Sequence, residues 1–241
     1  MINRTSFYLV SVLFTALILS NNIFAQSQKK AVVGIFLDNS GSLEKQFTDT
    51  LMLGRGIIKR VHPSGPIGLF HFKMGAAHLE ITEGVAWSQD ESELDKYLNG
   101  LSVALGRTPL FEAIQSIAEQ VEAKANSDKG GYGEKVIILI TDGEDRIERW
   151  KGRLLGGPQY EDEEKRRVAN HLIKKLKQSG IKVLSIGLTR ELDGDRLIKP
   201  TPRERAESIL KKISKETGGR AVISKSKKID VNSLLDELLA Q

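Results

Sequence analysis

The feature that most constrains this chain is a pair of apolar runs that each end in aspartate. In Ala31–Leu37, AVVGIFL, six apolar residues are interrupted only by Gly34, and Asp38 follows directly. Lys135–Asp142, KVIILITD, repeats the pattern. A short continuous apolar run of this kind is typical of a strand that is buried on both faces of a parallel sheet. We therefore expect these two strands to be neighbours at the centre of such a sheet.

Strands alternate with helices along the rest of the chain. Further strands are expected at Ile67–Phe72, Ala77–Thr82, Ile181–Leu188 and Arg220–Ser224. Helices are expected at Leu43–Val61, Asp90–Leu101, Leu110–Ala123, Glu163–Ser179, Arg203–Glu216 and Val231–Leu239. The turn between the strands at 67–72 and 77–82 is too short for a crossover helix, so this pair should be antiparallel. The pattern predicts an α/β fold: a doubly wound, mostly parallel six-stranded sheet with one antiparallel edge strand and helices on both faces.

The N-terminal segment has the composition of a secretory signal peptide. Residues 1–25 are assigned to this signal and residues 26–241 to a single domain. Arg4 supplies positive charge, Phe7–Leu19 is mostly apolar, and Ala25 is the small residue that a signal peptidase needs. The apolar part is short for a spanning helix, which needs about 20 residues, and retention as an N-terminal anchor is the alternative. The predicted location is secreted or periplasmic, with no membrane span in the mature chain.

The composition excludes several kinds of site. The chain has no cysteine, which rules out disulfides, a thiolate metal site and a thiol nucleophile. Its four histidines do not show zinc-type spacing. A formal net charge of +5 is spread over several basic clusters without interleaved aromatic residues. Such clusters are typical of solvated helix faces, so no nucleic-acid partner is expected.

Oxygen-bearing side chains follow the first apolar run. Asp38, Ser40 and Ser42 form the pattern D-x-S-x-S, and alternate positions of an extended segment point the same way. Oxygen donors without sulfur or imidazole favour a hard cation: Mg²⁺, with Mn²⁺ or Ca²⁺ as alternatives. The same residue types are also common in turns and helix caps, so this motif alone leaves both interpretations open.

Two residues elsewhere extend the pattern. Thr108 precedes Pro109 at a predicted helix start, where the simplest role of its hydroxyl is to cap the helix. Asp142 ends the second apolar strand and is followed by Gly143. Ligands of doubly wound sheets bind beyond the carboxyl ends of the strands, where the strand order reverses. Asp142 and Asp38 are expected to meet there.

Taken together, these residues resemble the metal-ion-dependent adhesion site of the von Willebrand factor type A domain, also called the integrin I domain. The matching positions are Asp38, Ser40, Ser42, Thr108 and Asp142. The resemblance extends from about Lys30 to the end of the chain, and it implies a Rossmann-like fold with a divalent metal ion, Mg²⁺ or else Mn²⁺ or Ca²⁺.

The resemblance also implies a role for each residue. Ser40 and Ser42 would bind the metal directly, and Thr108 would bind it directly or through water. Asp38 and Asp142 would act mainly through water or by accepting hydrogen bonds from coordinating groups. One of the waters that Mg²⁺ retains could then be replaced by a partner's carboxylate. The implied function is a metal-dependent protein-binding module for adhesion or assembly, not an enzyme, whose partner offers an Asp or Glu side chain.

Further expectations concern the surroundings of the site. The loops at 144–162 and 190–202 would lie at the same sheet edge and form a rim that selects the partner. The chain is expected to be monomeric on its own. Two alternatives remain: a Mg²⁺-dependent phosphotransferase or phosphatase-like enzyme, and a scaffold component of an envelope complex with a purely structural metal. An enzyme of the haloacid dehalogenase type would need D-x-D, with its second carboxylate at the position of Ser40.

Overall fold

The computed structural model describes residues 30–74, 79–105, 109–127, 131–143, 158–188, 202–224 and 230–239. The predicted signal peptide at 1–25 lies outside these residues, as does Thr108. The strands are β1 Ala31–Leu37, β2 Ile67–Met74, β3 Leu79–Ser88, β4 Glu134–Thr141, β5 Ile181–Leu188 and β6 Ala221–Ser224. The helices are α2 Phe47–Val61, α3 Glu91–Gly100, α4 Leu110–Ser127, α5 Pro158–Gln178, α6 Pro202–Glu216 and α7 Val231–Leu239, with short 3₁₀ helices η1 Gly41–Gln46 and η2 His62–Ser64.

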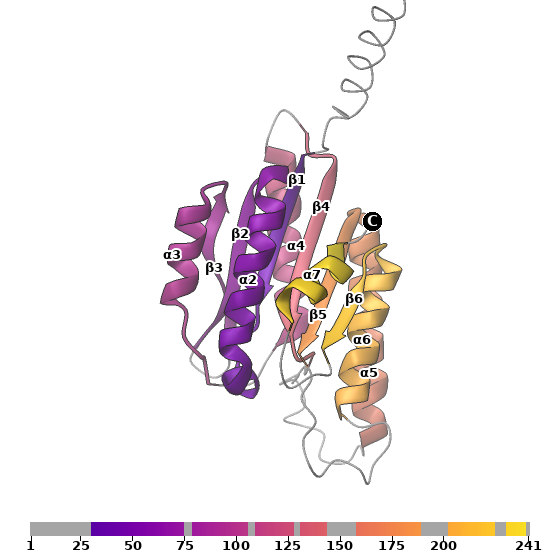
Figure 1. Cartoon of the computed structure of the whole chain (residues 1–241). Coiled ribbons are helices and arrows are strands. Elements are labelled where there is room, and N and C mark those ends of the chain that lie inside the picture. The colour runs from indigo at the N-terminus through magenta and orange to yellow at the C-terminus, as the bar shows by residue number, and fades with distance from the viewer. Residues whose placement is uncertain are drawn as a thin grey trace, which may run out of the picture.

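The described strands form one six-stranded sheet in the order β3-β2-β1-β4-β5-β6 (Figure 1). All neighbouring pairs are parallel except β2 and β3, which are antiparallel at one edge. The predicted fold class is therefore confirmed, including the central position of β1 beside β4. Because the chain leaves β1 toward one side of the sheet and β4 lies on the other, the strand order reverses between these two strands.

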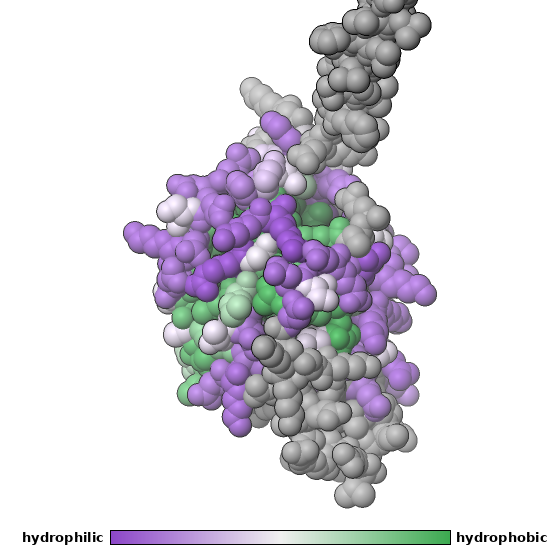
Figure 2. Space-filling view, viewed as in Figure 1, coloured by the Kyte–Doolittle hydropathy of each residue, from purple (hydrophilic) through white to green (hydrophobic). Residues whose placement is uncertain are grey.

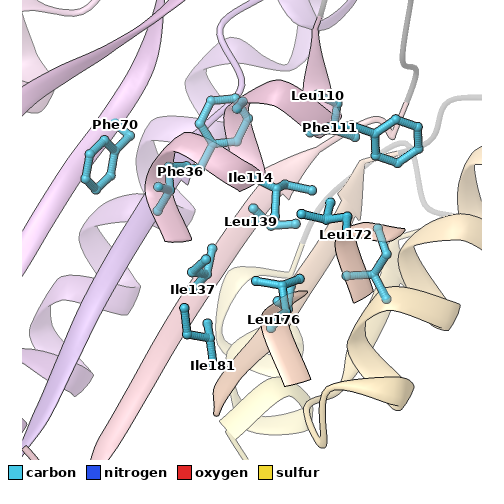
Figure 3. Close-up of a cluster of buried hydrophobic side chains, with 14 of the residues drawn as sticks. Phe36, Phe70, Leu110, Phe111, Ile114, Ile137, Leu139, Leu172, Leu176 and Ile181 are labelled. Carbon is cyan, nitrogen blue, oxygen red and sulfur yellow. The ribbon is translucent and has the colours of Figure 1, made fainter. Parts of the chain in front are cut away.

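Helices cover both faces of the sheet. On one face, α4, α5 and α6 pack over Val32, Phe36, Ile137 and Leu139 in a continuous core (Figure 3). On the other face, α2, α3 and α7 pack over the alternate strand residues, among them Val33, Ile35 and Leu37. Every residue of β1 is buried, which is why its sequence shows no polar alternation.

Several predicted boundaries need correction. The helix expected at Leu43–Val61 is a 3₁₀ turn followed by α2, which begins at Phe47. The loop expected at 144–162 ends earlier, because α5 already begins at Pro158. Proline suits the first helical position, where its missing N–H costs nothing, and the acidic residues that follow suit the helix N-terminus. The rest of that loop, and nearly all of the loop at 190–202, lies outside the described residues.

We also examined the described helices as possible membrane spans. None of them combines the length and the apolar character that crossing a bilayer requires.

Candidate metal site

The site lies where β1 and β4 end side by side. Leu37 is paired with Ile140, and the backbone N–H of Asp38 donates to the carbonyl of Ile140 at 2.9 Å. This bond extends the parallel pairing by one residue and places Asp38 next to Thr141. Asp142 follows Thr141 immediately and is half-buried. The two predicted aspartates therefore follow the ends of neighbouring central strands, at the point where the strand order reverses.

Asp38 is fully buried and held through both carboxylate oxygens. Its Oδ1 accepts a hydrogen bond from the backbone N–H of Ser40 at 3.0 Å. Its Oδ2 accepts one from the Thr141 hydroxyl at 2.6 Å, which spans 103 positions of sequence. Hydrogen bonds of this kind stabilise a buried carboxylate and fix its orientation. A carboxylate oxygen has more than one lone pair and can accept more than one hydrogen bond.

Ser40 and Ser42 present their hydroxyls to each other. Ser40 is buried and has an extended backbone conformation, Ser42 is exposed, and their Oγ atoms are 3.0 Å apart. Ser40 is the residue that precedes η1, but its side chain makes no capping hydrogen bond to that helix. The Ser40 hydroxyl therefore does not cap the helix, which was one of the two interpretations that the sequence left open.

Asn39, between these residues, ties three segments together. Its amide nitrogen donates to the carbonyls of Phe72 at 3.0 Å and Ser102 at 2.8 Å, and its amide oxygen accepts from the N–H of Phe72 at 2.9 Å. Its backbone carbonyl accepts from the N–H of Ala104 at 2.8 Å, and Ser40 forms a parallel bridge with Ala104. The chain that leads toward Thr108 is thereby fixed alongside the D-x-S-x-S loop.

Thr141 and Gly143 shape the other half of the site. The N–H of Gly143 donates to the Thr141 hydroxyl at 3.0 Å, so this hydroxyl links the turn after β4 to Asp38. Gly143 has φ of 77°, a conformation that favours glycine. A Cβ there would also lie 3.0 Å from side-chain atoms of Ala206 and Leu210.

The structure thus joins Asp38, Ser40 and Ser42 by hydrogen bonds and places Asp142 after the adjacent strand. Thr108 lies outside the described residues, so its position relative to the others stays a prediction. Within the described ranges, no three His, Cys, Asp or Glu side chains gather as a metal site, and the predicted set relies on hydroxyls instead. Sequence reasoning missed Asn39 and Thr141. Thr141 had a signal: it is a hydroxyl residue at the end of an otherwise apolar strand interior, directly before Asp142.

Comparison with known proteins identifies a family whose model this chain matches. The chain matches the model of the von Willebrand factor type A domain over residues 33–237. A search of curated protein sequences gives no match.

Solved structures share the fold at low sequence identity. Proximal thread matrix protein 1 from the mussel byssus matches with a TM-score of 0.57 and 16% identity, over 87% of this chain and 47% of its own. The VWA domain of SpRpn10 matches with a TM-score of 0.55 and 12% identity, over 86% of this chain and 94% of its own. The vWF domain of the type V pili tip protein Mfa5 from Porphyromonas gingivalis matches with a TM-score of 0.52 and 14% identity, over 80% and 89%. The chain thus spans about half the length of the mussel protein.

Proposed function

The chain belongs to the von Willebrand factor type A family, and from this premise we propose that it is a metal-dependent protein-binding module. Domains of this family generally mediate protein–protein interaction or adhesion. In our proposal, the end of β1 and the end of β4 hold a divalent cation, and that cation accepts a carboxylate from a partner protein.

The observation that carries this proposal is the geometry of the two serine hydroxyls. Adjacent ligands of an octahedral Mg²⁺, with bonds of ~2.0–2.1 Å, lie roughly 2.9–3.0 Å apart. The Oγ atoms of Ser40 and Ser42, which share a hydrogen bond, are already 3.0 Å apart. Ca²⁺, with bonds of about 2.3–2.6 Å, would need a wider spacing. The pair therefore suits Mg²⁺ or Mn²⁺ better than Ca²⁺.

The anchoring of Asp38 supports an indirect role for this carboxylate. Both of its oxygens are engaged by donors of the chain itself, so it is oriented before any ion arrives. We propose that Ser40, Ser42 and Thr108 hold the metal, and that Asp38 and Asp142 act through water or through hydrogen bonds to the coordinating groups. Neutral hydroxyl ligands leave the cation electron-poor, and it can then accept an Asp or Glu side chain from outside.

The edge around the site offers further contacts. Leu105 is 67% exposed, and one of its methyl carbons lies 3.2 Å from where a Cβ of Gly41 would stand. An apolar side chain is thus available to a partner directly beside the serine loop. The segments at 144–157 and 189–201 follow β4 and β5, which end at this edge of the sheet, and we propose that these segments help to select the partner.

We further propose that the protein acts outside the cytoplasmic membrane, secreted or periplasmic, and is monomeric on its own. The predicted signal peptide at 1–25 supports this location. Two of the similar structures are of a matrix protein from the mussel byssus and of a pilus tip protein, which agrees with this location.

The test is a pull-down from native envelope extract in Mg²⁺ and then in a chelator. We expect a partner that is retained only with Mg²⁺ and is lost for Ser40→Ala combined with Ser42→Ala. Ser208→Ala combined with Ser233→Ala removes two exposed hydroxyls elsewhere and serves as the matched control. Capture that survives both the chelator and the Ser40/Ser42 variant would contradict the proposal and favour the scaffold alternative. A phosphatase screen in Mg²⁺ tests the enzyme alternative. No described residue of the site argues specifically for an enzyme.

A further inference from the structure

Six exposed lysines lie in the C-terminal halves of α5 and α6. They are Lys174, Lys175 and Lys177 on α5, and Lys211, Lys212 and Lys215 on α6. We call this surface the lysine face. The sequence shows the first group as one basic cluster among several, but only the fold brings it against the second group, more than thirty positions away.

Contacts across the two helices show that the lysine face is continuous. The Nζ atom of Lys212 lies 2.7 Å from Oδ1 of Asn170, and that of Lys177 lies 3.5 Å from Oε2 of Glu216. Asn170, Lys174 and Lys177 share one side of α5, because residues three and four apart are neighbours on a helix surface. Lys174 therefore lies between two points at which α5 touches α6.

The positive charge of the lysine face is only partly balanced. Within the described residues, two of the six lysines are in ion pairs: Lys177 with Glu216, and Lys211 with Glu207 at 3.6 Å. Lysines in a last helical turn stabilise the helix dipole, which accounts for Lys175, Lys177 and Lys215. The dipole does not account for the other three, since its effect fades within one turn.

The lysine face lies at the end of the sheet where the parallel strands begin. Helices α5 and α6 each lead into a parallel strand, so their C-terminal ends lie at the amino ends of the strands (Figure 1). β1 begins at this same end, where residue 30 connects to the N-terminal segment with its apolar run Phe7–Leu19. In Figure 2, hydrophilic side chains predominate on the side of the molecule where α6 lies, and some hydrophobic ones are visible near the ends of the central strands. The candidate metal site lies at the opposite, carboxyl end of the strands.

We propose that the lysine face docks on an anionic phospholipid surface, with the metal site directed away from the membrane. Lysines near a membrane are attracted to anionic lipids. The N-terminal segment, for which retention as an anchor is the alternative to cleavage, joins the domain at the same end. Nucleic-acid sites favour arginine forks and stacking aromatic rings, and the C-terminal halves of α5 and α6, residues 168–178 and 209–216, contain no Arg, Phe, Tyr or Trp. The proposal does not depend on the metal site or on its partner.

Because the chain contains no cysteine, a single introduced cysteine gives a unique labelling position. The full chain is labelled with a fluorescent donor at Gln178→Cys, beside the lysine face, or at Thr48→Cys, at the opposite end; both residues are exposed. Energy transfer is measured to acceptor lipids in vesicles of phosphatidylcholine with or without phosphatidylglycerol, in a chelator. We expect transfer from position 178 to exceed that from position 48 only on the anionic vesicles.

Charge reversal tests whether the lysines cause this difference. Lys174→Glu combined with Lys212→Glu should reduce transfer from position 178 to the level on neutral vesicles, and 0.5 M salt should do the same by screening. Lys73→Glu combined with Lys96→Glu makes an equal charge change at exposed positions elsewhere and should leave the difference intact. If the first pair lowers the melting temperature, Lys174→Gln combined with Lys212→Gln replaces it, because it removes the two charges without placing carboxylates on the helices.

Two results of the vesicle experiment would overturn the proposal. One is equal transfer from positions 178 and 48 on anionic vesicles. The other is an excess at position 178 that survives charge reversal of the lysine face. Binding of a single-stranded oligonucleotide that depends on the same lysines, without any response to the vesicles, would assign the face to nucleic acid instead.

Discussion

At the scale of single residues, the site depends on side chains that the chain itself holds in place. Asp38 is buried with both oxygens occupied by donors, and one donor, the Thr141 hydroxyl, comes from the neighbouring strand. That hydroxyl in turn accepts from the N–H of Gly143. Thr141 therefore connects the two aspartate-bearing strand ends and acts as a positioning residue for the proposed metal site.

Replacing Thr141 with valine should test this role. The variant keeps the shape of the side chain but removes the donor to Asp38 and the acceptor for Gly143. Because one partner of the bond is charged, we expect a loss of about 1.5–3 kcal/mol in the free energy of unfolding. Urea unfolding measures it, and Mg²⁺ affinity should fall as well. Thr141→Ser keeps the hydroxyl and should retain the affinity; equal Mg²⁺ affinity in the valine variant would rule out the positioning role.

The candidate residues differ in how visible they are in the sequence. Asp38, Ser40 and Ser42 are recognisable because their spacing is short and alternate residues of an extended segment point the same way. The partners of Asn39 and Asp38 are 33 and 103 positions distant, so only the folded sheet brings them together. Such long-range contacts leave little local pattern to detect, and Thr141, a hydroxyl residue directly before Asp142, is the partial exception.

At the scale of elements, the central strands were the easiest to predict, because β1 and most of β4 are continuous apolar runs. The edge strand was placed less well: β3 extends to Ser88, six residues beyond the predicted end at Thr82. The bounds of β5 and α7 are those predicted from the sequence. The start of α5 was missed because the polar residues after Pro158 look like loop, although proline and acidic side chains suit a helix N-terminus. The 3₁₀ turn before α2 was missed because an amphipathic pattern does not distinguish the two helix types.

A polar pair joins β2, the strand next to the edge, to α3. The hydroxyl of Tyr97 on α3 is hydrogen-bonded to Nδ1 of His71 on β2, and the rings meet edge to face. Gly84 on β3 leaves room for the tyrosine ring, since a Cβ there would lie 1.8 Å from Cζ of Tyr97. Burial, with a smaller contribution from the charge of Lys73, lowers the pKa of His71 to about 4. Burial also raises the pKa of Tyr97 to about 12.

Because of the His71–Tyr97 pair, we expect the folded protein to lose stability in acid. Between pH 6.5 and about 4 the unfolded chain protonates His71 while the folded chain does not, so the free energy of unfolding should fall as the pH is lowered through this window. After discounting for partial exposure to solvent, we expect about 1–2 kcal/mol from this residue. Urea unfolding of the wild type and His71→Gln at pH 7 and pH 4 measures the contribution. A difference between the two proteins that is the same at both pH values would contradict it.

At the scale of the whole molecule, the fold separates two surfaces of different chemistry. The carboxyl ends of the strands carry hydroxyl and carboxylate oxygens, and the amino ends carry the lysine face beside the entry of the N-terminal segment. The first suits a cation and an acidic partner, and the second suits an anionic surface. A sheet of parallel strands imposes this separation, because it places all strand ends of one kind at one edge.

Titration of Mg²⁺ into the purified protein by isothermal calorimetry tests the central claim most directly. We expect saturable binding at a single site, tighter for Mg²⁺ than for Ca²⁺ because the serine hydroxyls are 3.0 Å apart. Ser40→Ala combined with Ser42→Ala should abolish that binding, while Ser208→Ala combined with Ser233→Ala should leave it unchanged. Wild-type protein that gives no saturable heat with Mg²⁺ or Mn²⁺, or a Ser40/Ser42 variant that binds as well as the wild type, would show that these oxygens do not form a metal site.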